Sequence, residues 1–357
     1  MRVGTALLFA SVVAACDVSR APRVAAAYSI KPPIGTDIFA DAADSGVAPV
    51  ALGISRWGAG APSVTIAAQA TAFAANPDVV AVVGHGGSRD ALLATSVYNH
   101  EGIAHLVPTA TSSRLESSGP WTFMLAPDDN GEGQFIANYA VDSLHARRIA
   151  LLYVGDEYGV GIRDGVMARL AVRGVEAVDA GVVPGVGCTS EVMTSLVVST
   201  VRAALKRGRP DLVVLAAGKA NAACILRTIL SEAPGVRVLC ADGVTLASAS
   251  VPHLPPSLRT SVWRVTFWVP RDDAATRAFM TRARRVLGRE PDAADALQYD
   301  AFMAVSSAVQ AVGANRAAIR RWLETLGTTH PALRGVTGPI AFNGERASLL
   351  YMVPIAP

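Results

Sequence analysis

The chain has 357 residues, of which 51% are hydrophobic and 17% are charged, and its formal net charge is +3. This length is enough for two domains that each bury a sizeable core, and the composition excludes a largely disordered chain. Basic residues do not form a dense stripe interleaved with aromatic ones, so nucleic acid is not an expected partner. After residue 15, no apolar run approaches the roughly 18 residues that span a bilayer.

The first residues have the pattern of an export signal. Arg2 precedes an apolar stretch, 5–15, that has the length of a signal peptide. The stretch ends in Val13-Ala14-Ala15-Cys16, which resembles the lipobox of bacterial lipoproteins. By this resemblance, residues 1–15 form a signal peptide, Cys16 is the lipidation site, and residues 16–22 are a lipidated N-terminus and linker. The protein is then exported and anchored to the cell membrane through its lipid. An ordinary signal peptide followed by a chance cysteine is the alternative.

Further along the chain, short apolar runs alternate with longer stretches of helical periodicity. Strands are predicted at 23–30, 47–54, 79–83, 103–107, 149–154, 175–183, 211–217, 236–240 and 262–269. Helices are predicted at 62–75, 88–100, 131–144, 162–173, 190–207, 220–231, 274–287, 293–312 and 317–325. Segments 336–342 and 347–353 are predicted to close the chain as a hairpin. This alternation is typical of parallel strands joined by crossover helices, so we predict an α/β protein with two doubly wound sheets.

Small polar residues follow three successive predicted strands. Ser88 follows the strand at 79–83, Thr109 and Thr111 follow the strand at 103–107, and Tyr158 follows the strand at 149–154. In parallel sheets, ligands bind in the crevice beyond the carboxyl ends of the strands. Ser88 also begins a predicted helix, so unpaired backbone N–H groups and the positive end of the helix dipole face the same crevice. The pattern favours holding a small polar molecule over reacting with it.

The sequence lacks the usual motifs of catalysis and of metal binding. His85-Gly-Gly87 is superficially similar to the oxyanion segment of esterases, but no Gly-x-Ser-x-Gly elbow occurs. The same segment lacks the Gly-Lys-Ser/Thr ending of a phosphate-binding loop. The six histidines show no metal-ligand spacing. We therefore expect no enzymatic activity, no cofactor and no metal.

Three cysteines lie outside the N-terminal signal: Cys188, Cys224 and Cys240. An odd number argues against a full disulfide framework. In an oxidising compartment, one hypothesis is a bridge between Cys224, near the start of a predicted helix, and Cys240, at the end of a predicted strand. Buried free thiols are the alternative.

The order and spacing of several segments resemble a known family, the type I periplasmic substrate-binding proteins of ABC transporters, in the leucine/isoleucine/valine-binding branch. The matching pieces are Val82-Val-Gly-His85 with Ser88, Tyr98 with Glu101-Gly-Ile103, Pro108-Thr-Ala-Thr111 with Leu115, Tyr158-Gly-Val-Gly161, Asp211-Leu-Val213, Asp242-Gly243 and Val336-Thr-Gly-Pro-Ile340. The resemblance implies two Rossmann-like lobes joined by three crossovers, near Pro127, Pro270 and Gly335, that act as hinges. One lobe would comprise 23–127 and 271–335, and the other 128–270 and 336–357.

The resemblance also implies roles for individual residues. In the amino-acid binders of this family, the hydroxyl matching Ser88 and the segment matching Thr109-Ala110-Thr111 hold the α-carboxylate of the ligand. The residue matching Asp242 pairs with the α-ammonium, and the one matching Tyr158 lies beside the ligand. Asp242 would supply the one negative charge that a buried ammonium needs.

The chain departs from the family pattern at two places. Only a short segment, 34–44, separates the first two predicted strands, where members usually have a longer helix. Gly218 and Lys219 stand where the branched-chain binder offers aromatic residues, which enlarges the side-chain pocket. Lys219 could accept an acidic or hydrogen-bonding substituent, so a branched-chain ligand is less expected than the family name suggests. A Lys219 side chain that points into solvent is the alternative.

The sequence therefore predicts a monomeric solute-binding lipoprotein that captures an amino acid or a close analogue between its lobes and delivers it to an ABC permease. The same fold can also serve a ligand sensor or a lipoprotein that regulates an envelope enzyme. Convergence of Ser88, Thr111, Tyr158 and Asp242 within one ligand length would favour the first hypothesis. Scattered side chains and a large exposed apolar patch would favour the second.

Overall fold

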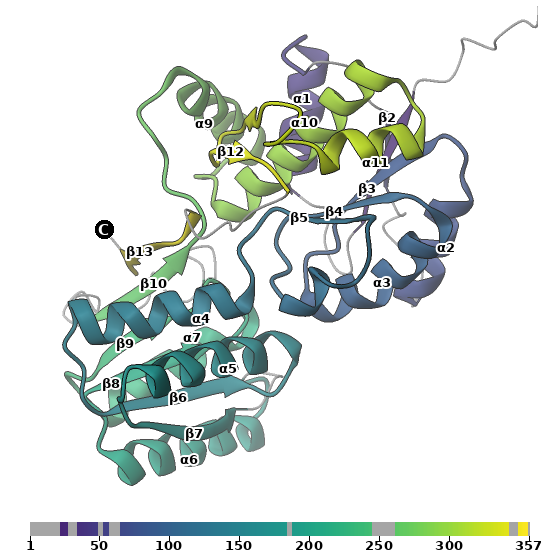
Figure 1. The fold of residues 1–357 in the computed structure, drawn as a ribbon. Helices are drawn as coiled ribbons and strands as arrows, with labels where there is room; N and C mark the ends of the chain where they lie inside the picture. Colours follow the sequence, from purple (N-terminus) through teal and green to yellow (C-terminus); the bar gives the residue numbers. More distant parts are fainter. Residues whose placement is uncertain are drawn as a thin grey trace, which may run out of the picture.

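The structure is a computed structural model of the chain, and it describes residues 22–27, 34–48, 53–56, 65–183, 188–244, 261–342 and 349–355. Within these residues the chain folds into two lobes, each built around one large sheet (Figure 1). The predicted signal peptide and Cys16 lie outside the described residues.

The first lobe contains a five-stranded parallel sheet in the order β2-β1-β3-β4-β5. Its strands are β1 (Arg23–Ala26), β2 (Gly53–Arg56), β3 (Val79–Val83), β4 (Ala104–Val107) and β5 (Thr122–Met124). Figure 1 shows α2 (Ile66–Ala75) and α3 (Ser88–Glu101) on one side of this sheet, and α1 (Ile34–Asp44), α10 (Ala293–Val312) and α11 (Arg316–Glu324) on the other. Helix α9 (Ala274–Leu287) packs beside α1. Every residue of β3 is buried, as expected for a strand that is covered on both faces.

The second lobe contains a six-stranded sheet in the order β13-β10-β9-β8-β6-β7, in which only the β10–β13 pair is antiparallel. Its strands are β6 (Ile149–Val154), β7 (Ala177–Val183), β8 (Leu212–Ala216), β9 (Arg237–Cys240), β10 (Val262–Thr266) and β13 (Tyr351–Pro354). The helices are α4 (Asp129–Asn138), which continues into a π-helical turn (Tyr139–Ser143), α5 (Glu157–Val172), α6 (Glu191–Gly208) and α7 (Lys219–Glu232).

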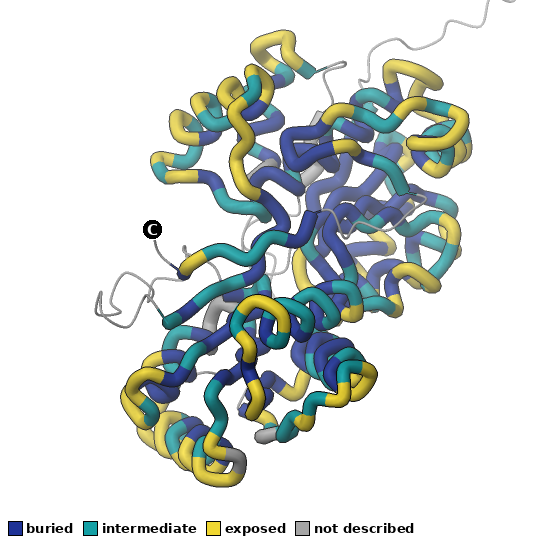
Figure 2. Tube along the Cα trace, turned by 60° about the vertical axis from the view of Figure 1, so that its left-hand side comes forward, coloured by how far each residue is buried: buried dark blue, intermediate teal, exposed yellow. Residues whose placement is uncertain are grey.

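The alternation of side chains along β6 explains why this sheet is covered on both faces. Residues 149, 151 and 153 belong to the hydrophobic cluster that contains α4 and α5, whereas 150, 152 and 154 belong to the cluster that contains α6 and α7. Helices α4 and α5 approach closely at Gly133, where a Cβ atom would lie 2.7 Å from the backbone nitrogen of Val166. Burial is concentrated along the strands and on the inner faces of the helices, and the outer faces of the helices are exposed (Figure 2).

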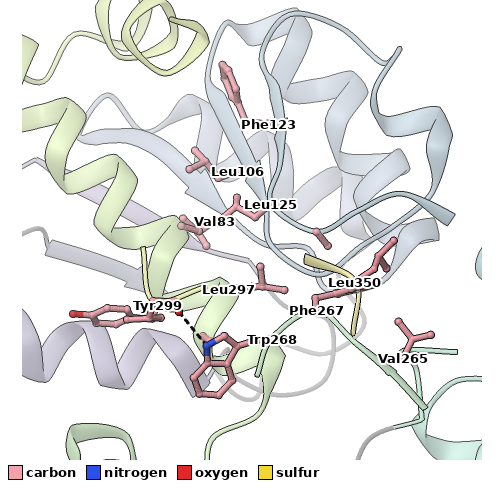
Figure 3. Packing of buried hydrophobic residues seen from close by; sticks show 14 of the residues in the cluster. Val83, Leu106, Phe123, Leu125, Val265, Phe267, Trp268, Leu297, Tyr299 and Leu350 are labelled. Atoms are coloured by element: carbon pink, nitrogen blue, oxygen red, sulfur yellow. Dashed lines mark hydrogen bonds between the residues drawn. The ribbon is translucent and has the colours of Figure 1, made fainter. Parts of the chain in front are cut away.

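The chain passes between the lobes three times. It leaves the first sheet after β5, returns to α9 after β10, and passes again from the small hairpin of β11 (Leu333–Arg334) and β12 (Pro339–Ile340) to β13. Buried side chains from both lobes pack together where these segments meet (Figure 3). There the indole Nε1 of Trp268 donates a hydrogen bond to the carbonyl oxygen of Val336 at 3.0 Å, which joins two of the crossing segments. The α/β architecture with two lobes and three crossovers is thus as predicted.

Most predicted helices and strands match the structure, but two local predictions differ. Segment 34–44 is a helix, α1, and it is held on α10 by stacked rings of Phe39 and Phe302 with centroids 5.3 Å apart. The second strand occupies Gly53–Arg56, whereas 47 and 48 are not in a strand. Strand β5, which has three residues, was not predicted. Such a short strand lacks the alternation on which a prediction depends.

The predicted C-terminal hairpin is wrong, because its two segments pair with different strands. Strand β12 pairs with β11, and β13 pairs with β10 in the second lobe. Val336 and Thr337 lie between β11 and β12. Their backbone N–H groups donate hydrogen bonds to the carboxylate of Asp300 on α10, both at 2.9 Å. This buried contact with α10 fixes the third crossing segment on the first lobe.

The proposed bridge between Cys224 and Cys240 is also wrong. Cys188 and Cys224 form the disulfide, with their Cα atoms 6.1 Å apart, and Cys240 is a buried free thiol on β9. Burial raises the pKa of the Cys240 thiol to about 12, so it stays protonated. The bridge ties the segment before α6 to α7, and Cys240 instead contributes to the apolar core between the sheet and these helices.

Candidate functional site

A cavity of about 640 Å³ lies between the two lobes, beyond the carboxyl ends of strands from both sheets. The predicted residues Ser88, Thr109 and Thr111 line it from the first lobe, and Tyr158 and Asp242 line it from the second. Two predicted site residues, Ala110 and Lys219, remain. Ala110 is buried and is not part of the lining. Lys219 begins α7 beside Gly218, which does line the cavity, but the Lys219 side chain lies outside the described part of the structure.

The side of the cavity formed by the first lobe is rich in hydrogen-bond donors. Ser88 is the first residue of α3 and not its cap, since the N-cap is Gly87, which offers no side-chain oxygen. The N–H groups in the first turn of a helix have no partner within the helix, and the helix dipole makes this end favourable for an anion. The Ser88 hydroxyl lies 3.4 Å from the backbone nitrogen of Thr111, and that of Thr109 donates to the carbonyl oxygen of Gly86 at 3.2 Å. Hydroxyls from two strand ends therefore meet at one helix N-terminus.

The opposite side of the cavity carries a carboxylate that is positioned by a tyrosine. The hydroxyl of Tyr158, in the first turn of α5, donates a hydrogen bond to Asp242 Oδ1 at 2.7 Å and accepts one from Gly243 N at 2.9 Å. Burial, followed by the field of Asp242, raises the pKa of Tyr158 well above its usual value, so the phenol remains a donor. A Cβ atom at Gly243 would lie 2.7 Å from the carbonyl oxygen of Ala217, so this close approach requires glycine.

Two buried acids behind Asp242 were not found by sequence reasoning. Glu132 Oε1 accepts a hydrogen bond from the backbone nitrogen of Asp242 at 2.8 Å. Burial and then the field of Asp242 raise the pKa of Glu132 well above its ordinary value. Burial raises the pKa of Asp129, also on α4, to about 8. Asp129 is therefore largely protonated at neutral pH, and burial likewise favours the neutral form of Glu132.

Comparison with known proteins identifies the family. Residues 58–352 match the family described as periplasmic binding protein. The chain belongs to the periplasmic binding proteins. The resemblance found in the sequence is confirmed, and this is a type I periplasmic binding protein of the branch that is similar to Leu/Ile/Val-binding proteins.

Curated relatives of this periplasmic binding protein cover part of its length. It is 26% identical over 247 residues to Leu/Ile/Val-binding protein homolog 1 of Brucella abortus (strain 2308), a match that covers 69% of this chain and 63% of the relative. It is 29% identical over 104 residues to the Leu/Ile/Val/Thr-binding protein of Salmonella typhimurium, which covers 29% of this chain and 28% of the relative. The match to the Brucella relative thus spans less than two thirds of that protein.

Solved structures of similar proteins have the same fold. An ABC transporter substrate-binding protein from Desulfitobacterium hafniense in complex with Leu has a TM-score of 0.71 and 20% identity, covering 93% of this chain and 96% of that one. A solute binding protein of an ABC transporter from Rhodopseudomonas palustris in complex with benzoate has a TM-score of 0.74 and 14% identity, covering 94% and 93%. At these identities the likeness concerns the fold.

The lobes of this binding protein also touch at the edge of the cavity. Glu157, the first residue of α5, accepts hydrogen bonds from the Ser112 hydroxyl at 3.0 Å and from the Arg114 guanidinium at 3.1 and 3.2 Å. Ser112 and Arg114 follow β4 in the first lobe, so this contact bridges the two lobes beside the lining residues. Exposed ion pairs of this kind contribute about 0–1 kcal/mol. The contact can therefore align the lobes without locking them.

Among the described residues, no group of three or more His, Cys, Asp and Glu side chains could hold a metal ion. None of the helices within those residues is both long and apolar enough to cross a bilayer.

Proposed function

We propose that the protein is a solute-binding protein that captures an amino acid between its lobes and delivers it to an ABC permease. The observation that carries this proposal is the arrangement of one cavity. A donor-rich helix N-terminus with Ser88 and Thr111 lies on one lobe, and Asp242, positioned by Tyr158, lies on the other. An amino-acid zwitterion has one anionic and one cationic group, which these two sides complement.

In this mechanism, the α-carboxylate binds first to the hydroxyls and backbone N–H groups of the first lobe. The second lobe then closes over the ligand and brings Asp242 to the α-ammonium. The carboxylate of Asp242 is held by the Tyr158 hydroxyl at 2.7 Å, so its orientation is set before the ligand arrives. Closure is favoured with ligand present, because it brings the ligand ammonium into contact with the carboxylate of Asp242. No chemical step is needed.

The remaining parts of the proposal concern location and partners. We propose that the chain is exported, that Cys16 carries the lipid anchor, and that the membrane-anchored protein acts as a monomer. Hinges near Pro127, Pro270 and Gly335 would separate lobe 1 (23–127 and 271–335) from lobe 2 (128–270 and 336–357). The convergence of the predicted residues on one cavity supports ligand capture over a purely regulatory partner role, for which scattered groups are expected.

A thermal-shift screen of the purified protein against the amino acids and their amide and acidic analogues tests the proposal. A ligand at 100 times its dissociation constant adds about 2.7 kcal/mol to the free energy of unfolding. For lobes of this size each kcal/mol raises the melting temperature by roughly 2–4 °C, so the rise should be roughly 5–11 °C. A selective shift supports the proposal. An absence of any shift, after co-purified ligand has been removed by unfolding and refolding, contradicts it.

A further inference from the structure

A cationic side chain also lines the cavity close to Asp242. The α-carboxylate and α-ammonium of an amino-acid ligand already have their partners, so neither of them gives this side chain a role. This residue is Arg264, on β10. Arg264 pairs in register with Cys240 on β9, and Asp242 follows Cys240 by two residues. The guanidinium and the carboxylate therefore come from adjacent strands at the same edge of the second sheet. Sequence reasoning missed Arg264 because it lies within an otherwise apolar predicted strand.

Arg264 has unused hydrogen-bonding capacity. Its Nε atom is buried and meets no hydrogen-bond partner among the residues that the structure describes. A guanidinium has five N–H donors in a planar fork, and a buried charge that lacks partners is costly. Burial lowers the pKa of Arg264, while the fields of Asp292 and then of Asp242 favour its charged form, so the side chain remains a cation. The site is therefore able to accept an anion from a ligand.

Three of the acids that line the same cavity hold contacts of their own with other groups. Asp156 caps α5 by accepting from Gly159 N at 2.9 Å, and Asp292 caps α10 by accepting from Ala294 N at 3.0 Å. Glu157 is paired with the guanidinium of Arg114. The other arginine of the lining, Arg89, is exposed, whereas Arg264 is half-buried.

The surroundings of Arg264 suit a short chain that ends in an acid. The lining near it in sequence continues with Thr266 and Phe267, and α10 adds Ala293 and Leu297. These mostly apolar groups can cover the methylenes of a ligand side chain, and the guanidinium can bind a terminal carboxylate with two parallel hydrogen bonds. A fully aliphatic side chain would instead leave the Arg264 donors unsatisfied, which disfavours it strongly.

We propose that Arg264 binds a carboxylate on the side chain of the ligand and thereby selects an acidic amino acid of the glutamate or aspartate type. This inference rests on the proposed amino-acid function and specifies the ligand class for the same cavity. It assigns to Arg264 the role that the sequence suggested for Lys219.

Isothermal titration of the purified, lipid-free exported protein with L-glutamate, L-glutamine and L-leucine tests the proposal. Glutamine has nearly the same shape as glutamate but lacks the charge. We expect glutamate to bind more tightly than glutamine by roughly tenfold or more. The stabilisation from one hydrogen bond to a charged group corresponds to about a tenfold change in Kd. Arg264→Gln should remove this preference, and Arg264→Lys should retain part of it, since lysine keeps the charge without the planar fork.

The outcomes separate the two proposals. If wild-type protein binds leucine or glutamine as tightly as glutamate, Arg264 does not select an acid, although amino-acid capture stands. The same conclusion follows if Arg264→Gln weakens all three ligands equally. If none of the three ligands nor any other amino acid binds, the proposed function fails and this inference fails with it. If Arg264→Gln folds poorly, the comparison of the three ligands on the wild-type protein still tests the inference.

Discussion

Replacing Asp242 by asparagine should weaken ligand binding while leaving the empty protein at least as stable. In the wild type, the Tyr158 hydroxyl donates to Asp242 Oδ1 at 2.7 Å. Asparagine keeps an oxygen that can accept this hydrogen bond, but it lacks the charge that pairs with the ligand ammonium. Loss of one partner of a buried charge pair costs about 2–5 kcal/mol, which is a factor of roughly 30 to several thousand in Kd.

The effect on stability should have the opposite sign. The charge of Asp242 would repel the ionised forms of Glu132 and Asp129, which helps to raise both pKa values and makes these acids costly to bury at neutral pH. Removal of that charge relieves the repulsion, so the melting temperature of ligand-free Asp242→Asn should equal or exceed that of the wild type. Binding residues that are held at a cost to stability behave in this way.

Isothermal titration and thermal unfolding of the same preparation measure both quantities. Asp164→Asn is a matched control, because it removes one negative charge from a side chain on α5 that is 63% exposed and does not line the cavity. The control should change neither Kd nor stability by more than about 0.5 kcal/mol. If Asp242→Asn lowers stability and leaves Kd unchanged, Asp242 is a structural residue and the proposed ligand geometry is refuted.

Three further predictions concern stability. Asp300→Ala leaves two buried backbone N–H groups without their acceptor, so it should lower the free energy of unfolding by about 2–4 kcal/mol in denaturant titrations; an effect below about 1 kcal/mol would contradict the assigned contacts. Asp129 has a folded-state pKa of about 8, above its unfolded value, so its contribution to stability is fully present at low pH and is lost as the pH rises through about 8. Unfolding measured from pH 5 to pH 8 should therefore show stability falling with pH by up to about 1 kcal/mol per unit, and Asp129→Asn should flatten this slope. Reduction of the Cys188–Cys224 bridge, which spans 36 residues, should lower the free energy of unfolding by about 3–4 kcal/mol, and Cys188→Ser should reproduce this loss without added reductant.

The predictable part of the site follows from a single topological rule. Ser88 and Thr111 each follow a strand of the first sheet, and the carboxyl ends of parallel strands share one edge of a sheet. Tyr158 follows a strand of the second sheet in the same way. Local sequence was enough to find the strands and therefore to bring Ser88 and Thr111 together, whereas the approach of Tyr158 from the other lobe was implied by the family resemblance. Asp242 was found through the family resemblance and the same rule, since it follows β9.

The rest depended on contacts between distant parts of the chain. Cys224 had two candidate partners, and its choice of Cys188 is set by where α6 and α7 pack. The C-terminal segments looked like a hairpin because both are strands, but β13 pairs with β10, which lies in the other lobe from β12. Glu132 lies on α4, and its burial results from the packing of that helix against the second sheet. A periodic pattern shows that a residue faces inward or outward, and it does not show what the residue meets.

The distribution of charge in the cavity explains why the acids behind it do not prevent binding of an acidic ligand. Glu132 and Asp129 are buried, and their raised pKa values favour the neutral forms, which add little negative field. Asp242 and Arg264, one of each sign, come from adjacent strands at the cavity end of the second sheet. Asp156 and Glu157, which follow β6, are held by the α5 cap and by Arg114. A ligand that offers an ammonium to Asp242 and a carboxylate to Arg264 satisfies both at once, and its own α-carboxylate is left for the helix N-terminus at Ser88. Three separate charge contacts on a small ligand give specificity chiefly by excluding other ligands. A ligand that lacks one of the three charged groups leaves a polar group of the cavity without its ligand contact.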